Sequence, residues 1–300
     1  MRILISGASG LVGTATAGAL RADGHEVARF ARQKGASSPG DVRWDPASAF
    51  IDAQTMEGAD AIVHLAGAGI ADARWSEARK KVLRDSRMNS TRTLVDAIAQ
   101  LQQKPRVLIA ASGVGYYGDR GDETLTESSS NGNGFIAALA RDWETQSLRA
   151  ESLGLRVVML RFGMVLSAHG GALPRIVTPF KLGVGGRLGS GKQWISWIAL
   201  EDATGVIRSV LEDEKLSGPI NVVTPNPVRN AEFTTALARV LHRPAIFPVP
   251  GFALRLALGE MADELLLVSQ RVNPRKLVTQ GYAFRFPDLD AAFHSLFRAT

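Results

Sequence analysis

The feature that most constrains the fold lies at the start of the chain, where a glycine-rich turn joins an apolar run to an amphipathic one. Residues Arg2–Ser6 are mostly apolar and have the length of a buried strand. The turn Gly7–Gly13 follows directly, and Leu11–Arg21 has the spacing of a helix. A strand, a tight turn and a helix in this order predict the first unit of a parallel α/β sheet.

The chemistry of the turn points to a dinucleotide. The first glycine allows a tight turn, the second lets the main chain approach a pyrophosphate, and the third lets helix and strand pack closely. The helix N-terminus then faces the phosphates. The alternative is a purely structural glycine turn. We predict that the turn binds a dinucleotide through Gly7, Ser9, Gly10, Leu11, Val12 and Gly13.

The second predicted strand, Glu26–Ala31, indicates which dinucleotide binds. An NAD site usually ends this strand with Asp or Glu, which binds the ribose hydroxyls. Here the strand ends without an acid, and Arg32 stands at its end with Lys34 nearby. A guanidinium suits the 2′-phosphate of NADP, so we predict NADP(H); the alternative is that Arg32 only faces solvent.

Strand-like and helix-like segments alternate through the first half of the chain. Further strands are expected at 61–65, 106–111 and 156–161, and helices at 76–101 and 135–153. This alternation predicts an α/β fold with a doubly wound parallel (Rossmann) sheet. After Ser167 glycines and prolines become frequent, which predicts a smaller C-terminal substrate lobe. The expected domains are 1–167, with later segments crossing back, and 168–300.

Composition excludes several classes of function. The sequence of 300 residues has no cysteine, so disulfides and thiolate sites are excluded and a cytoplasmic location is expected. Its net charge of +6 comes without a basic stripe, so no nucleic acid is expected. No apolar run is long enough for a membrane span. The histidines lack metal-site spacing, so no metal is expected, and no serine-hydrolase elbow is present.

The chain resembles the extended short-chain dehydrogenase/reductases, and within them the atypical "epimerase family" that has its own small C-terminal domain, here at about 247–295. Beyond the glycine turn, the resemblance is carried by Trp44-Asp45-Pro46, His64–Gly67, Arg74-Trp75, Ser86-Arg87, Ser112–Asp119, Trp143-Glu144, Arg161–Leu166, Gly189–Gln193, Ser196-Trp197-Ile198 and Ser269–Leu277.

One departure from ordinary members concerns their Tyr-x-x-x-Lys pair, in which the Tyr moves a proton and the Lys lowers its pKa. The three tyrosines here, Tyr116, Tyr117 and Tyr282, are followed four residues later by Arg120, Gly121 and Phe286. The resemblance implies that this subfamily lacks the pair as well. Ser112, Tyr116 and Tyr117 remain the candidate catalytic residues, with packing or cofactor contact as the alternative for the tyrosines.

The resemblance also implies further contacts and two possible functions. Leu65, Ala66, Gly67, Ser112 and Arg161 are expected at the cofactor, with a buried ion pair as the alternative for Arg161, and Gln193 and Trp197 at the substrate. The first function is an NADP(H)-dependent oxidoreductase or epimerase acting on a small polar molecule such as a nucleotide sugar. The second is an NADP(H)-binding regulatory or sensor protein without turnover. A monomer or homodimer is expected in either case.

Overall fold

The computed structural model describes residues 1–32 and 40–297, so Lys34 lies outside the described residues. It contains an eight-stranded sheet with the order β12-β8-β6-β5-β1-β2-β3-β4. The strands are β1 (Arg2–Ser6), β2 (Glu26–Arg32), β3 (Val42–Asp45), β4 (Phe50–Ile51), β5 (Ala61–His64), β6 (Val107–Gly113), β8 (Arg156–Phe162) and β12 (Gly218–Val222).

The middle of the sheet is parallel and fully buried. Strand β1 pairs in parallel with β2 on one side and with β5 on the other, so that Leu4 lies between Ala28 and Ile62. Ile3, Leu4 and Ile5 have no exposed surface. From β1 the chain moves first to β2 and later to β5 on the opposite side. The strand order therefore reverses at the carboxyl end of β1, where open α/β sheets bind their ligands.

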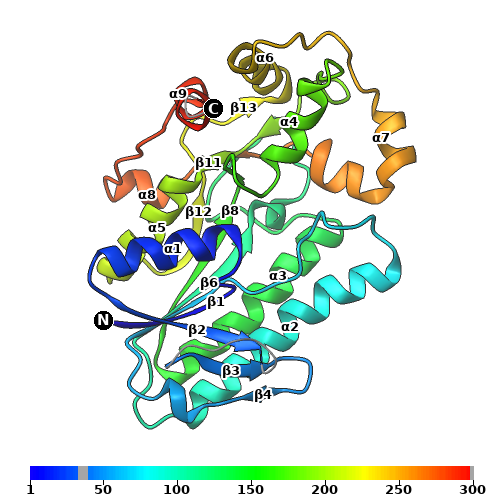
Figure 1. Ribbon diagram of the computed structural model, residues 1–300. Helices are drawn as coiled ribbons and strands as arrows, with labels where there is room; N and C mark the ends of the chain where they lie inside the picture. Colours follow the sequence, from blue (N-terminus) through cyan, green and yellow to red (C-terminus); the bar gives the residue numbers. More distant parts are fainter. Residues whose placement is uncertain (33–39, 298–300) are drawn as a thin grey trace. The chain divides into compact units, whose positions relative to one another are not determined.

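Helices cover both faces of this sheet. Helix α1 (Leu11–Ala22) lies on one face, and α2 (Glu77–Gln100) and α3 (Phe135–Leu148) lie on the other (Figure 1). Leu94 and Ile98 of α2 are fully buried in a core shared with sheet residues such as Leu4. The doubly wound Rossmann sheet predicted from the sequence is confirmed.

The chain divides into two compact units whose segments are interleaved. Unit 1 comprises Met1–Ser112, Leu139–Leu160 and Thr204–Ile220, and it contains most of the eight-stranded sheet. Unit 2 comprises Gly113–Ala138, Arg161–Ala203 and Asn221–Thr300.

Unit 2 is built from short strands and helices around its own core. Three two-stranded sheets pair β7 (Thr124–Leu125) with β14 (Arg271–Val272), β9 (Met164–Leu166) with β11 (Trp197–Ala199), and β10 (Trp194–Ile195) with β13 (Val228–Arg229). The core includes Trp197, Phe233 and Phe293. The helices are α4 (Leu173–Lys181), α6 (Asn230–Leu241), α7 (Gly251–Leu258), α8 (Arg275–Thr279) and α9 (Leu289–Phe297); α5 (Leu200–Glu212) runs from unit 2 into unit 1.

The predicted elements differ from the observed ones mainly at their ends. The helix expected over 135–153 is an α-helix only to Leu148 and continues as a 3-10 helix, Arg149–Leu153. Gly154 then ends the segment with a φ of 87°. Within residues 1–32 and 40–297, no helix is both long and apolar enough to span a bilayer.

Candidate functional site

The glycine turn is shaped by close main-chain contacts. A Cβ on Gly13 would lie 2.2 Å from the carbonyl oxygen of Gly7. A Cβ on Gly7, whose φ is +69°, would lie 2.7 Å from the carbonyl oxygen of Leu65. Both positions therefore need glycine for the turn itself. A Cβ on Gly10 would approach only the Gly7 oxygen, at 3.3 Å, so the surface above Gly10 is otherwise open.

Helix α1 begins directly above this open surface. Gly10 is its N-cap residue and provides no side chain to cap the helix, and the first turn holds no acidic residue. The first main-chain N–H groups of a helix have no partner within the helix, and its N-terminus carries a partial positive charge. Ser9 and Gly10 are exposed, and Leu11 and Val12 are half-buried. This end of α1 can therefore receive an anionic group such as a phosphate.

The loop Leu65–Gly67 is held beside the glycine turn by Ser6. The Ser6 hydroxyl accepts hydrogen bonds from the main-chain N–H groups of Leu65 (3.1 Å) and Ala66 (3.2 Å). Its own proton is left to donate to Nδ1 of His64, at 2.7 Å. Ser6, which directly precedes the glycine turn, therefore also anchors the loop Leu65–Gly67. The predicted cofactor contacts in these two segments lie together in unit 1.

His64 extends this network into the core. Its Nε2 lies 3.0 Å from the hydroxyl of Thr91, which also accepts a hydrogen bond from Nε1 of Trp143 at 3.0 Å. Because Ser6 donates to Nδ1, the ring carries its proton on Nε2. His64 is completely buried, and this burial lowers its pKa to about 4. The ring is thus neutral at neutral pH and serves to position the loop.

Arg32 ends β2 and is exposed, as expected for a residue that could face a 2′-phosphate. An acid does approach the same strand from elsewhere: Asp41 accepts hydrogen bonds from the main-chain N–H of Arg29 at 2.9 Å and from its guanidinium at 2.7 Å. That carboxylate is therefore engaged with Arg29. Arg32 makes no hydrogen bond or ion pair with the other described residues.

Ser112 lies near the carboxyl end of β6 and is almost fully buried. Its hydroxyl donates a 2.7 Å hydrogen bond to Oε1 of Glu144, a residue of α3 that is equally buried. The proton that we expected to face a substrate is therefore bound to a carboxylate in this structure. Glu144 was not predicted as a site residue; its position beside Trp143 in a motif of the resemblance was the available signal.

The tyrosines and Arg161 belong to the interior of unit 2. Tyr117 has no exposed surface; its hydroxyl donates to Oδ1 of Asn221 at 2.7 Å and accepts from Arg161 at 2.9 Å. Burial raises the pKa of Tyr117 to about 12. The Cζ of Arg161 lies 3.5 Å from the ring centroid of the half-buried Tyr116, and its Nη1 also donates to the main-chain oxygen of Glu127 at 3.4 Å. Arg161 is only 3% exposed and packs among these groups, and its expected contact with the cofactor stays a prediction.

The two residues expected at the substrate are interior as well. Trp197 is fully buried in the core of unit 2, and its Nε1 donates to the main-chain oxygen of Asn226. Gln193 is 6% exposed, and its Nε2 donates to the main-chain oxygens of Leu188 and Leu266. Both side chains are almost fully buried and hydrogen-bonded to main-chain oxygens in this structure, and their expected contact with a substrate stays a prediction.

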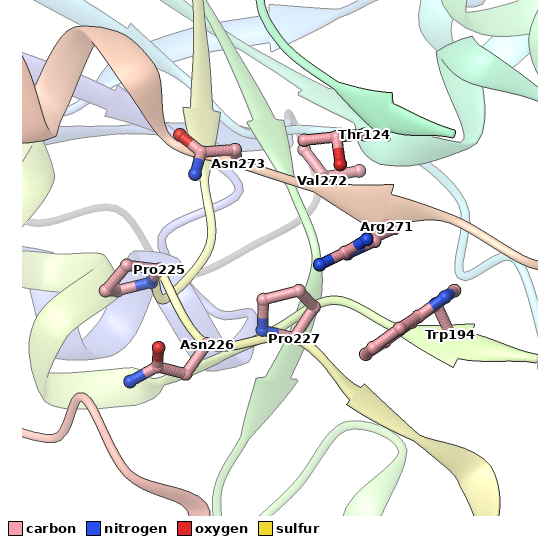
Figure 2. Close-up of a pocket in the computed structure, with 8 residues that line it drawn as sticks. All are labelled: Thr124, Trp194, Pro225, Asn226, Pro227, Arg271, Val272 and Asn273. Carbon is pink, nitrogen blue, oxygen red and sulfur yellow. The ribbon is translucent and has the colours of Figure 1, made fainter. Parts of the chain in front are cut away.

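Trp194, between these two residues in the chain, does face a pocket. The pocket has a volume of about 230 Å³ and lies within unit 2. Arg271 and Trp194 lie on one side of it and Pro225 and Asn226 on the other (Figure 2). The Cζ atoms of Arg229 and Arg271 lie 4.0 and 4.8 Å from the centroid of the Trp194 ring. The alternation of side chains along an extended strand could have pointed to Trp194 once Gln193 was taken as interior.

The fold, the glycine turn and the loop at the switch point define a nucleotide-binding Rossmann protein, and comparison with known families agrees. The chain belongs to the NAD dependent epimerase/dehydratase family, whose model matches residues 3–223. Residues 249–296 match a second model, described as a domain of unknown function (DUF1731). The predicted resemblance is thus confirmed.

Individual relatives extend over the whole chain. An epimerase family protein of Mycobacterium bovis is 45% identical over 282 residues, 94% of this chain and 93% of that protein. The crystal structure of human epimerase family protein SDR39U1 (isoform 2) with NADPH is 34% identical, with a TM-score of 0.89 and 100% of both chains covered. The structure of a nucleoside-diphosphate sugar epimerase from Corynebacterium glutamicum is 36% identical, with a TM-score of 0.82, and covers 99% of this chain and 58% of that one.

Proposed function

We propose that this protein binds NADP(H) on unit 1. The observation that carries the proposal is the open surface at Gly10, which lies under the uncapped N-terminus of α1 and beside the anchored loop Leu65–Gly67. Arg32 at the end of β2 adds a group for the 2′-phosphate. The human relative whose structure contains NADPH supports the same cofactor.

We further propose that the protein is an oxidoreductase or epimerase acting on a small polar substrate such as a nucleotide sugar. NADP(H), when bound, would accept or supply a hydride. The name of the Corynebacterium glutamicum relative supports this substrate class. In unit 1, Ser112 and Glu144 are the pair able to hold a proton at the end of β6. The hydroxyl of Tyr117 is buried and already has two partners, which favours the Ser112–Glu144 pair over Tyr117 as the proton donor.

A second function is favoured by that same observation. The hydroxyl of Tyr117 is interior, and no tyrosine of this chain has a lysine four residues later. Such a protein could hold NADP(H) as a regulatory or sensor protein without turnover. Both functions require the cofactor, so the first experiment is a titration with NADPH and with NADH. Absence of NADPH binding would refute both.

Turnover separates the two functions. Purified protein is examined by mass spectrometry for ligands that co-purify with it, and then assayed for NADPH oxidation with candidate sugar nucleotides. A Ser112→Ala variant with unchanged NADPH affinity and lower turnover supports the enzyme. Stoichiometric NADPH binding with no oxidation by any reducible or epimerisable compound supports the sensor.

A further inference from the structure

Arg87 lies directly against the loop that the proposed cofactor would contact. It belongs to α2, in unit 1, and its side chain is half-buried. A Cβ placed on Gly67 would lie 3.3 Å from Cζ and 3.5 Å from Nη2 of Arg87. The guanidinium thus packs against the main chain of Gly67, where a larger residue would crowd it.

The aromatic ring of Trp143 also supports this guanidinium. The Cζ of Arg87 lies 4.9 Å from the ring centroid of Trp143. The ring is itself fixed, because its Nε1 donates to Thr91, the same hydroxyl that lies beside His64. Arg87 therefore rests on a surface that the buried network of unit 1 holds in place, and it is preorganised for a ligand.

Arg87 nevertheless has no anionic partner in the part of the chain that the structure describes. Among the described residues, its guanidinium makes one hydrogen bond, from Nη1 to the main-chain oxygen of Leu83 at 3.0 Å. Arg84 of the same helix differs, since it pairs with Asp142 at 2.7 Å. Burial, with a smaller effect of the nearby Arg79, lowers the pKa of Arg87 to about 10. A partly buried guanidinium without a carboxylate lowers the stability of the fold unless an anionic ligand pairs with it.

Holding the loop is not that use, because other residues of α2 do it. The hydroxyl of Ser86 accepts a hydrogen bond from the main-chain N–H of Ala68 at 3.1 Å. Arg79 donates to the main-chain oxygen of Gly69. The remaining N–H groups of Arg87 are left to bind a group that none of residues 1–32 and 40–297 provides.

We propose that Arg87 binds a phosphate group lying over Gly67, an anion site separate from the N-terminus of α1. The planar guanidinium binds phosphate through paired hydrogen bonds. The phosphate has two possible sources: the pyrophosphate of NADP(H), in which case the inference rests on the proposed function, or a phosphorylated second ligand.

The test compares Arg87→Gln with Arg92→Gln, a control on an exposed arginine of the same helix. If the phosphate belongs to the cofactor, Arg87→Gln weakens NADPH binding by about tenfold or more, the usual effect of losing charge-assisted hydrogen bonds, and the control does not. If it belongs to a second ligand, NADPH binding is unchanged. Inorganic phosphate then raises the melting temperature of the NADPH-saturated wild type but not that of Arg87→Gln.

The outcomes remain separable if the proposed function fails. A wild type that does not bind NADPH, yet is stabilised by inorganic phosphate in an Arg87-dependent way, refutes the function and keeps the anion site. An Arg87→Gln protein that matches Arg92→Gln in both assays overturns the anion site. Arg87→Met keeps an unbranched apolar side chain against Trp143 and replaces Arg87→Gln in both assays if that variant does not fold.

Discussion

The geometry of the glycine turn predicts opposite effects on stability for two substitutions of glycine by alanine in α1, Gly13→Ala and Gly18→Ala. The Cβ of Gly13→Ala would lie 2.2 Å from the Gly7 oxygen, 2.8 Å from the Gly7 carbonyl carbon and 2.9 Å from the Ala8 Cα. All three are main-chain atoms, so the turn or the helix must shift. Overpacking of this kind costs about 1–3 kcal/mol of unfolding free energy.

Gly18→Ala is the matched control within the same helix. Beyond its chain neighbours and the backbone of its own helix, no described residue lies within 4 Å of a Cβ at Gly18, so this variant gains only the helix propensity of alanine and is stabilised by about 0.5–1 kcal/mol. Gly13→Ala gains the same propensity, and the difference between the two variants therefore isolates the clash. Urea unfolding of both, fitted with a common m-value, gives this difference.

The substitution Gly10→Val tests NADPH binding separately from folding. Among the described residues beyond its chain neighbours and its own helix backbone, the added Cβ of Gly10→Val approaches the Gly7 oxygen at 3.3 Å and no other atom within 4 Å. Its side chain would instead occupy the surface proposed for the pyrophosphate, so we expect a folded protein without NADPH binding. A Gly13→Ala protein as stable as Gly18→Ala would refute the packing argument. A folded Gly10→Val protein that binds NADPH like the wild type would show that the phosphates lie elsewhere.

The remaining predictions concern single side chains. Arg32→Ala should narrow the difference between NADPH and NADH binding by about 1–3 kcal/mol, measured by fluorescence titration; an unchanged difference contradicts a role at the 2′-phosphate. Ser112→Ala should lower the unfolding free energy by about 1–3 kcal/mol because buried Glu144 loses the hydrogen bond from Ser112, whereas Ser112→Thr, which retains a hydroxyl, should lower it less. Tyr117→Phe should be destabilising by a similar amount, and equal stability to the wild type would contradict its network. His64 binds a proton in the unfolded state near pH 6.5 but in the folded state only near pH 4, so acidification through this range should cost up to about 3 kcal/mol, and His64→Gln should remove that part of the pH dependence.

The fold was predictable because its signals are local. The apolar runs of β1, β2 and β5 are short and separated by turns, and the glycine turn fixes how the first strand meets α1. The strands β3 and β4 were not predicted, since four and two residues are too few for periodicity to distinguish them from a loop. The change of α3 into a 3-10 helix at Arg149 has no comparable sequence signal.

The site was predictable only where function depends on the main chain. Glycines at fixed spacing mark positions where the main chain leaves no room for a side chain, so the turn at Gly7–Gly13 could be predicted from the sequence. The burial of Trp197 and Gln193 could not be predicted, because a motif shows that residues belong together without showing which of them face inward. The sequence offered Arg87 only as part of the Ser86-Arg87 motif. That no carboxylate of the described residues pairs with its guanidinium is visible only in the three-dimensional structure.

The location of Tyr117 fits a chain that departs from ordinary short-chain dehydrogenases and keeps the proposed cofactor surface. Tyr117, Asn221 and Arg161 satisfy one another within unit 2. The groups that would hold the dinucleotide, from the glycine turn to Leu65–Gly67, are positioned by Ser6 and His64 within unit 1. Each of these hydrogen bonds joins described residues of a single unit. Replacing a catalytic tyrosine and lysine therefore leaves the cofactor surface intact, and proton transfer in any reaction must be sought among groups such as Ser112 and Glu144.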